Sequence, residues 1–96
     1  MSSLKIVATL ISTAAHDEEL DAAVRALADE SRKEPGCLSY VICKTAANPR
    51  KTVILEEWKD QAAIDAHNQA PHFTAFGSAI EGRIESLHIM VLETVY

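Results

Sequence analysis

The sequence has few of the features that mark a disordered, disulfide-linked or nucleic-acid-binding chain. Only three glycines and three prolines occur among 96 residues, and 48% of the residues are hydrophobic, which excludes a disordered or linker-rich protein. The two cysteines, Cys37 and Cys43, are separated by about 20 Å along one predicted strand, so we expect reduced thiols rather than a disulfide between them. A net charge of −5 opposes binding to nucleic acid or to an anionic membrane, because both require a basic surface.

Long apolar runs are also missing. No stretch approaches the roughly 18 residues needed to span a bilayer, and the segment from Met1 to Lys5 lacks the charged start and apolar stretch of a signal peptide. We therefore expect a cytoplasmic protein that has no membrane partner. Its length fits one compact domain, residues 1–96.

The hydrophobic periodicity predicts six main elements in the order strand, helix, strand, strand, helix, strand. Residues 4–11 are rich in Ile, Val and Leu, which is typical of a strand. Residues 16–33 carry a helical apolar stripe, with acidic residues in the first turn and Arg32 and Lys33 in the last. The other predicted elements are strands at 37–45, 51–59 and 87–96, a short helix through 62–67 with Asp60 as N-cap, and another helix that begins at Pro71.

That order is the split βαβ, or ferredoxin-like, arrangement of the α+β class, in which helices cover one face of a four-stranded antiparallel sheet. The first and last predicted strands are apolar on both faces. One chain has no second helical layer for the other face, which would leave a large apolar patch in water. We therefore expect a homodimer that packs sheet to sheet.

Three short runs connect a helix end, two strands and the following helices into one predicted pocket. They are Arg32-Lys33-Glu34-Pro35-Gly36-Cys37, Glu56-Glu57-Trp58, and Ala63-Ile64-Asp65-Ala66-His67 followed by Pro71-His72-Phe73. In order and spacing these runs resemble the antibiotic biosynthesis monooxygenase family, and the resemblance covers almost the whole chain. It implies a dimeric α+β barrel and a quinol-type monooxygenase that works without metal, flavin or heme.

The resemblance also implies other reactions. Some members of the family isomerise a phosphorylated sugar derivative, and others degrade heme with a Trp and a His in the pocket, here Trp58 and His67. The heme-degrading branch also uses an Asn in the first strand, and residues 4–11 contain none. Two rival functions stay open, an isomerase of a small phosphorylated carbonyl sugar derivative and a non-enzymatic dimeric module that binds a small molecule.

A monooxygenase without a cofactor uses its substrate as the reductant, because a quinol that a base has ionised can pass an electron to O2. His67 is the candidate for that base or for an orienting group, since imidazole titrates near neutral pH. The alternative is a histidine at a helix end that hydrogen-bonds a carbonyl group. The expected partners are a small aromatic hydroquinone or polyketide-like substrate and O2, with no cofactor.

Glu56 and Trp58 are expected to line the same pocket as His67. They lie two residues apart in a strand and so project to one face, where an indole offers a platform for an aromatic ring. The alternative is that Trp58 is a core or interface residue and that Glu56 pairs with a basic group or bonds to the backbone.

Tyr40 is expected to line the wall of the pocket, where its hydroxyl group donates to a substrate oxygen or bonds to a buried polar group. Strand alternation places it on the face of Leu38 and Ile42, opposite Cys37 and Cys43. The two cysteines are expected to be small apolar fillers of the other face.

His72 and Phe73 are expected at the rim of the pocket, because they follow Pro71 at the start of a helix. His67 and His72 also raise the question of a metal. They lie five residues apart across a helix break, which is not the i, i+4 spacing of a helical zinc pair, and the sequence shows no third ligand beside them. The sequence therefore predicts no metal site.

Overall fold

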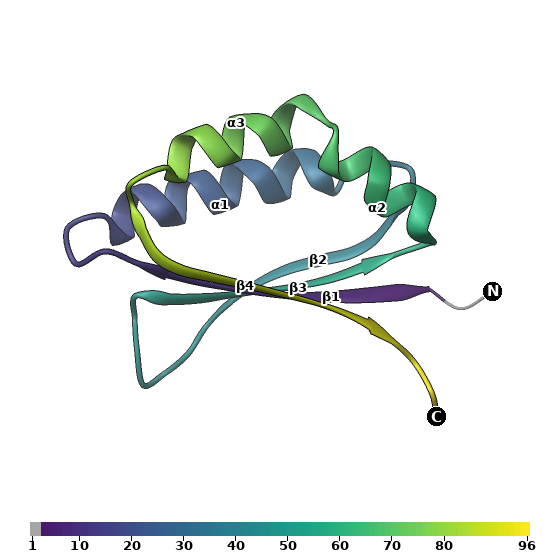
Figure 1. The fold of residues 1–96 in the computed structure, drawn as a ribbon, viewed down its shortest axis with the longest axis horizontal. Helices are drawn as coiled ribbons and strands as arrows, with labels where there is room; N and C mark the ends of the chain where they lie inside the picture. Colours follow the sequence, from purple (N-terminus) through teal and green to yellow (C-terminus); the bar gives the residue numbers. More distant parts are fainter. Residues whose placement is uncertain (1–2) are drawn as a thin grey trace.

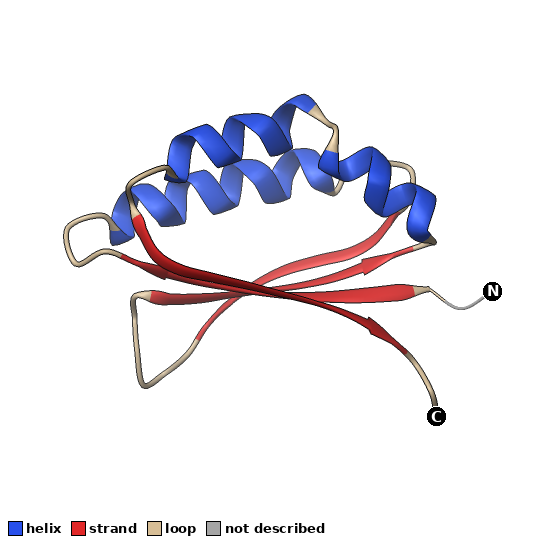
Figure 2. Cartoon of the chain, viewed as in Figure 1, coloured by secondary structure: helices blue, strands red, loops and turns tan. Residues whose placement is uncertain are grey.

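The computed structural model describes residues 3–96 and has two layers, in which three helices cover one face of a sheet (Figures 1 and 2). The sheet is antiparallel throughout and has the strand order β2-β3-β1-β4, which confirms the predicted ferredoxin-like fold. Among the described helices, none has the length and apolar character that a bilayer crossing requires. In chain order the elements are β1 (Leu4–Ser12), α1 (Asp17–Ser31), β2 (Cys37–Lys44), β3 (Lys51–Trp58), α2 (Gln61–Asn68), α3 (Pro71–Ile80) and β4 (Ile84–Glu93).

Helix α1 buries the predicted apolar stripe but ends two residues early. Arg32 is its C-cap, and Lys33 lies beyond the helix, so the prediction that these two residues stabilise the last turn is wrong. The guanidinium Nε of Arg32 instead donates to the backbone carbonyl of Tyr40 at 2.9 Å, and Lys33 pairs with Glu30 at the surface. The buried residues of the stripe are Leu20, Val24, Leu27, Ala28 and Ser31.

The helix starts that position the candidate site follow from local chemistry. The carboxylate of Asp60 accepts a hydrogen bond from the backbone N–H of Ala63 at 2.9 Å, which confirms Asp60 as the N-cap of α2. Pro71 occupies the first turn of α3, where its missing N–H costs no hydrogen bond. These two signals place His67 near the end of α2 and His72 at the start of α3.

A β-bulge at Leu38 interrupts the ladder between β2 and β3. The extra residue shifts the alternation of side chains, so Cys37 packs against the core on the side of Tyr40, and Leu38 is 57% exposed. The predictions that Leu38 shares a face with Tyr40 and that Cys37 shares one with Cys43 are therefore wrong. Ile42 lies beyond the bulge and shares the face of Tyr40 as predicted.

The sheet face opposite the helices carries an apolar row and is uncovered within one chain. Strand register aligns Val41, Leu55, Val7 and Met90 in one row across all four strands, and three of these side chains are 43–54% exposed. β4 begins three residues earlier than predicted and forms an edge of the sheet beside β1. Its residues stay largely exposed on both faces.

Gly36 allows α2 to pack directly on the chain that enters β2. A Cβ atom at this position would lie 2.3 Å from the Cβ of Ala63 in α2, closer than two carbon atoms can approach. The carbonyl of Gly36 also accepts the backbone N–H of Lys59 at 2.9 Å. The contact therefore sets the distance between the turn that follows α1 and the helix that carries His67.

Replacing Gly36 with alanine should destabilise the fold. Because α2 must move away from the added methyl group, we expect Gly36→Ala to lower the free energy of unfolding by about 1–3 kcal/mol in urea titrations. Gly77→Ala is the matched control, since a methyl group there meets no atom within 4 Å, and it should raise stability by about 0.5–1 kcal/mol. Wild-type stability of Gly36→Ala would show that α2 does not pack as described.

Candidate functional site

A pocket of about 480 Å³ lies between the helices and the sheet. This volume is within the range of small-molecule sites. Most of the wall is apolar, and β4 contributes one side of it through Leu87, Ile89 and Val91. No Lys or Arg is among the residues that line it. The polar lining residues are Tyr40, Glu56, His67 and Asn68.

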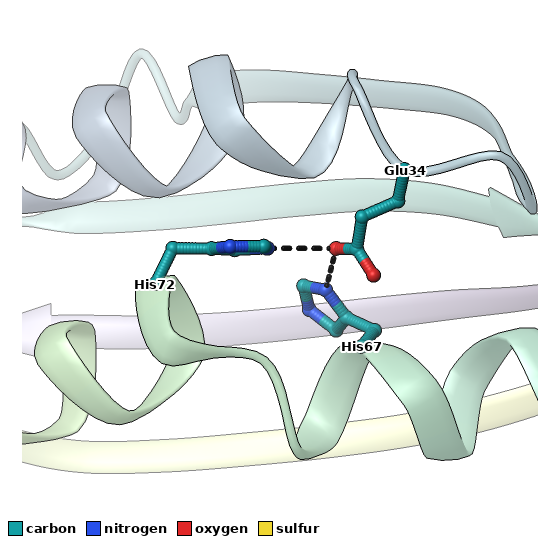
Figure 3. A group of neighbouring side chains, drawn as sticks. All are labelled: Glu34, His67 and His72. Carbon is teal, nitrogen blue, oxygen red and sulfur yellow. Dashed lines mark hydrogen bonds and ion pairs between the residues drawn. The ribbon is translucent and has the colours of Figure 1, made fainter.

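His67 reaches this pocket from the last turn of α2, with a side chain only 3% exposed. Its Nδ1 lies 2.6 Å from Oε2 of Glu34, which stands in the turn between α1 and β2 (Figure 3). An ionised carboxylate only accepts hydrogen bonds, so Nδ1 carries the proton of the neutral ring. Nε2 is then the ring nitrogen with the free lone pair, as a general base requires.

Glu34 forms hydrogen bonds with both His67 and His72. Its Oε2 also lies 2.8 Å from Nε2 of His72, so that one oxygen accepts hydrogen bonds from the end of α2 and from the start of α3 (Figure 3). The prediction that no third ligand accompanies the two histidines is therefore wrong, because Glu34 lies beside both. Glu34 stands in the first of the three sequence runs, but no spacing rule connects it to residues 33 and 38 positions away.

Glu56 and Trp58 lie on the helix-facing side of β3, and they bond to each other. The indole Nε1–H of Trp58 donates to Oε1 of Glu56 at 2.8 Å, so the partner of Glu56 is not a basic group. Trp58 is fully buried and its ring centroid is 4.5 Å from that of His67. Trp58 thus supports Glu56 and His67 from behind, while Glu56 itself lines the pocket.

Burial raises the pKa values of two polar groups of the pocket. It raises the pKa of Glu56 to about 7, with a further contribution from the charge of Glu34 and an opposing one from the hydrogen bond of Trp58. Burial, together with the nearby Glu56 carboxylate, also raises the pKa of Tyr40 well above its ordinary value. Below about pH 7 the pocket therefore offers Glu56 and Tyr40 as neutral donors, beside Nε2 of His67 as an acceptor and the amide of Asn68.

The two residues expected at the rim have different positions. Phe73 lines the pocket and packs edge-on against His67, with ring centroids 5.0 Å apart. His72 lies outside the lining, bonded to Glu34 beside a shallow hollow between α1 and α3. Asn68 lines the pocket and was not anticipated, because nothing in its spacing separates it from a surface residue at a helix end.

Known proteins resemble this chain in both sequence and fold. The "probable quinol monooxygenase YgiN" of Escherichia coli is 32% identical over 69 residues, which cover 64% of this chain and 66% of that protein. The crystal structure of PA3566 from Pseudomonas aeruginosa superposes with a TM-score of 0.95 at 29% identity and covers 100% of this chain and 97% of that chain. A crystal structure of an antibiotic biosynthesis monooxygenase gives a TM-score of 0.91 at 28% identity, covering 97% and 99% of the two chains.

The relatives found by sequence are longer than the segments that match this chain. The chain spans 40% to 66% of the length of the first relatives that it matches. The family model described as antibiotic biosynthesis monooxygenase matches residues 3–79, which include all three sequence runs and the whole Glu34–His67–His72 cluster. The chain therefore belongs to the antibiotic biosynthesis monooxygenase family.

Proposed function

We propose that this protein is a quinol-type monooxygenase that oxidises a small aromatic hydroquinone or polyketide-like substrate with O2 and needs no cofactor. The observation that carries the proposal is a buried imidazole, His67, which lines an apolar pocket and whose Nδ1 bonds to Glu34, so that Nε2 of the neutral ring is left as an acceptor. The name of the Escherichia coli relative supports the same reaction class.

The reaction begins with a proton transfer. Nε2 of His67 takes the proton of a substrate hydroxyl group, and the carboxylate of Glu34 stabilises the imidazolium that forms. The electron-rich quinolate then passes electrons to O2. One oxygen atom enters the ring and the other leaves as water, so that hydroquinone and O2 give a hydroxyquinone and water. The substrate supplies all the electrons.

The other pocket residues bind the substrate and exclude water. Tyr40 and protonated Glu56 donate hydrogen bonds to substrate oxygens, and a neutral Glu56 avoids repulsion with the quinolate. Phe73 and the apolar wall hold the ring and keep water from the reactive intermediate. Trp58 and His72 act indirectly, through Glu56 and Glu34.

The rival functions find less support in the pocket. An isomerase of a phosphorylated substrate needs a cation for the phosphate group, and no Lys or Arg lines the pocket. Arg32, the first residue of the first sequence run, donates to the carbonyl of Tyr40. A binding module without activity is the reading that remains if no substrate is turned over.

The assembly in this proposal is a homodimer in the cytoplasm. The row Val41, Leu55, Val7 and Met90 lies on the face that no helix covers, and a second copy of the same sheet would bury it. Two sheets packed in this way form an α+β barrel with the helices outside.

Oxygen uptake tests the reaction. Metal-free and flavin-free protein should consume O2 with a member of a hydroquinone and anthrone panel, after autoxidation is subtracted. His67→Ala should lower the rate by about 10²- to 10⁴-fold, because the general base is lost. His16→Ala, a change of the same kind near the start of α1 and outside the pocket, should keep the wild-type rate. Unchanged turnover in His67→Ala would remove His67 from the mechanism.

The raised pKa of Glu56 predicts a pH-dependent stability. Between pH 4.5 and about 7 the unfolded chain loses the Glu56 proton while the folded protein keeps it, so stability falls as the pH rises. Glu56→Gln keeps an acceptor for Trp58 and has no carboxyl proton to lose. Between pH 4.5 and a pH above 7, the free energy of unfolding of the wild type should therefore fall by up to about 3 kcal/mol more than that of Glu56→Gln. Urea unfolding at both ends of the range measures it. Glu57→Gln on the opposite face of β3 is the control, and equal gains in both variants would contradict the prediction.

Light scattering tests the dimer. The wild type should elute with twice the mass of one chain at micromolar concentration. Leu55→Glu places a charge in the centre of the apolar row and should give monomers, because burying an unpaired carboxylate is costly. Ala22→Glu adds the same charge on the exposed face of α1 and should leave the dimer intact. A monomeric wild type would refute the assembly.

A further inference from the structure

We infer that Glu34, His67 and His72 form a binding site for a divalent metal ion of the zinc type, and that an ion bound there turns off His67 as the base. The first half of this inference stands on the geometry of the cluster. The second half rests on the proposed function, since it concerns the same histidine.

The three side chains offer one ligand atom each, and these atoms converge. Oε2 of Glu34, Nδ1 of His67 and Nε2 of His72 all lie within 4.8 Å of one another, and both rings direct a nitrogen at the same oxygen (Figure 3). Zinc binds nitrogen and oxygen ligands at about 2.0–2.2 Å, which places neighbouring ligand atoms about 3–3.5 Å apart. The N–O distances of 2.6 and 2.8 Å therefore need to open by less than about 1 Å.

The donor set and its surroundings also suit a cation. Two imidazoles and one carboxylate are the three-ligand set of many zinc sites that keep a further position open. Neighbouring basic side chains have other partners, since Arg32 donates to a backbone carbonyl and Lys33 pairs with Glu30. The Glu34 and His72 side chains are 15% and 19% exposed, so an ion can enter from their side while His67 stays buried.

Metal binding changes the tautomer of His67. In the hydrogen-bonded cluster Nδ1 carries the proton and Nε2 the lone pair. A metal ion at Nδ1 needs a lone pair on that nitrogen, so the proton of the neutral ring must move from Nδ1 to Nε2. Nε2–H donates but does not accept a proton. The ring neither gains nor loses a proton in this exchange, yet it stops being a base.

Zinc titration of untagged, metal-free protein tests the site without any substrate. Calorimetry should show one equivalent of Zn²⁺ per chain, and thermal unfolding should shift to higher temperature. Glu34→Gln and His72→Gln should each weaken the binding at least about tenfold. Glu30→Gln removes a carboxylate from the last turn of α1, close in sequence to Glu34, and should bind zinc as the wild type does. With Co²⁺ in place of zinc, the spectrum should lack the thiolate charge-transfer band that Cys37 or Cys43 would cause.

The outcomes separate the two halves of the inference. Absence of zinc binding, or binding that Glu34→Gln and His72→Gln leave unchanged, overturns the site. Zinc that binds at the cluster and blocks oxygen uptake with the same half-saturation supports both halves, whereas zinc that binds there without slowing uptake overturns the tautomer argument. If zinc binds at the cluster and no substrate is oxidised even without zinc, the site stands and the proposed function fails.

Discussion

The hydrogen bond between Glu34 and His67 is the interaction on which the rest of the site depends. It connects a turn after the first helix to the end of the second, and it selects the tautomer of a buried ring. The close approach of Gly36 and Ala63 makes this bond possible, because it brings the two segments together without an intervening side chain. Gly36, which sets the backbone packing, and Glu34, which bonds to His67, thus lie within three residues of each other in the sequence.

The apolar pocket makes its few polar groups more effective. Burial raises the pKa values of Glu56 and Tyr40. As neutral donors, these two groups suit the proposed substrate, which becomes anionic. Trp58 holds Glu56 through its indole N–H, so the carboxyl group has a defined orientation. For the proposed substrate, an aromatic ring with oxygen substituents, the pocket offers apolar contacts and hydrogen bonds, without a charged side chain from Lys or Arg in its lining.

Local signals in the sequence were enough to predict the fold. Asp60 and Pro71 mark helix starts through their own backbone chemistry, and strand periodicity gives the sheet, so these predictions needed no tertiary information. The bulge at Leu38 was missed because a single extra residue leaves the hydrophobic pattern almost unchanged. The role of Glu34 was missed for a different reason, since its partners lie far along the chain and meet it only after α2 and α3 have packed.

Strand β4 belongs to two surfaces at once. Leu87, Ile89 and Val91 form a wall of the pocket, and Met90 lies on the opposite side of the same strand in the apolar row. Point substitutions can thus alter one surface and spare the other, so the lining of the pocket can vary without a change in the apolar row. The insertion or deletion of one residue in β4 would exchange the two sets of side chains and damage both surfaces together. Variation along this strand should therefore occur by substitution, at constant length.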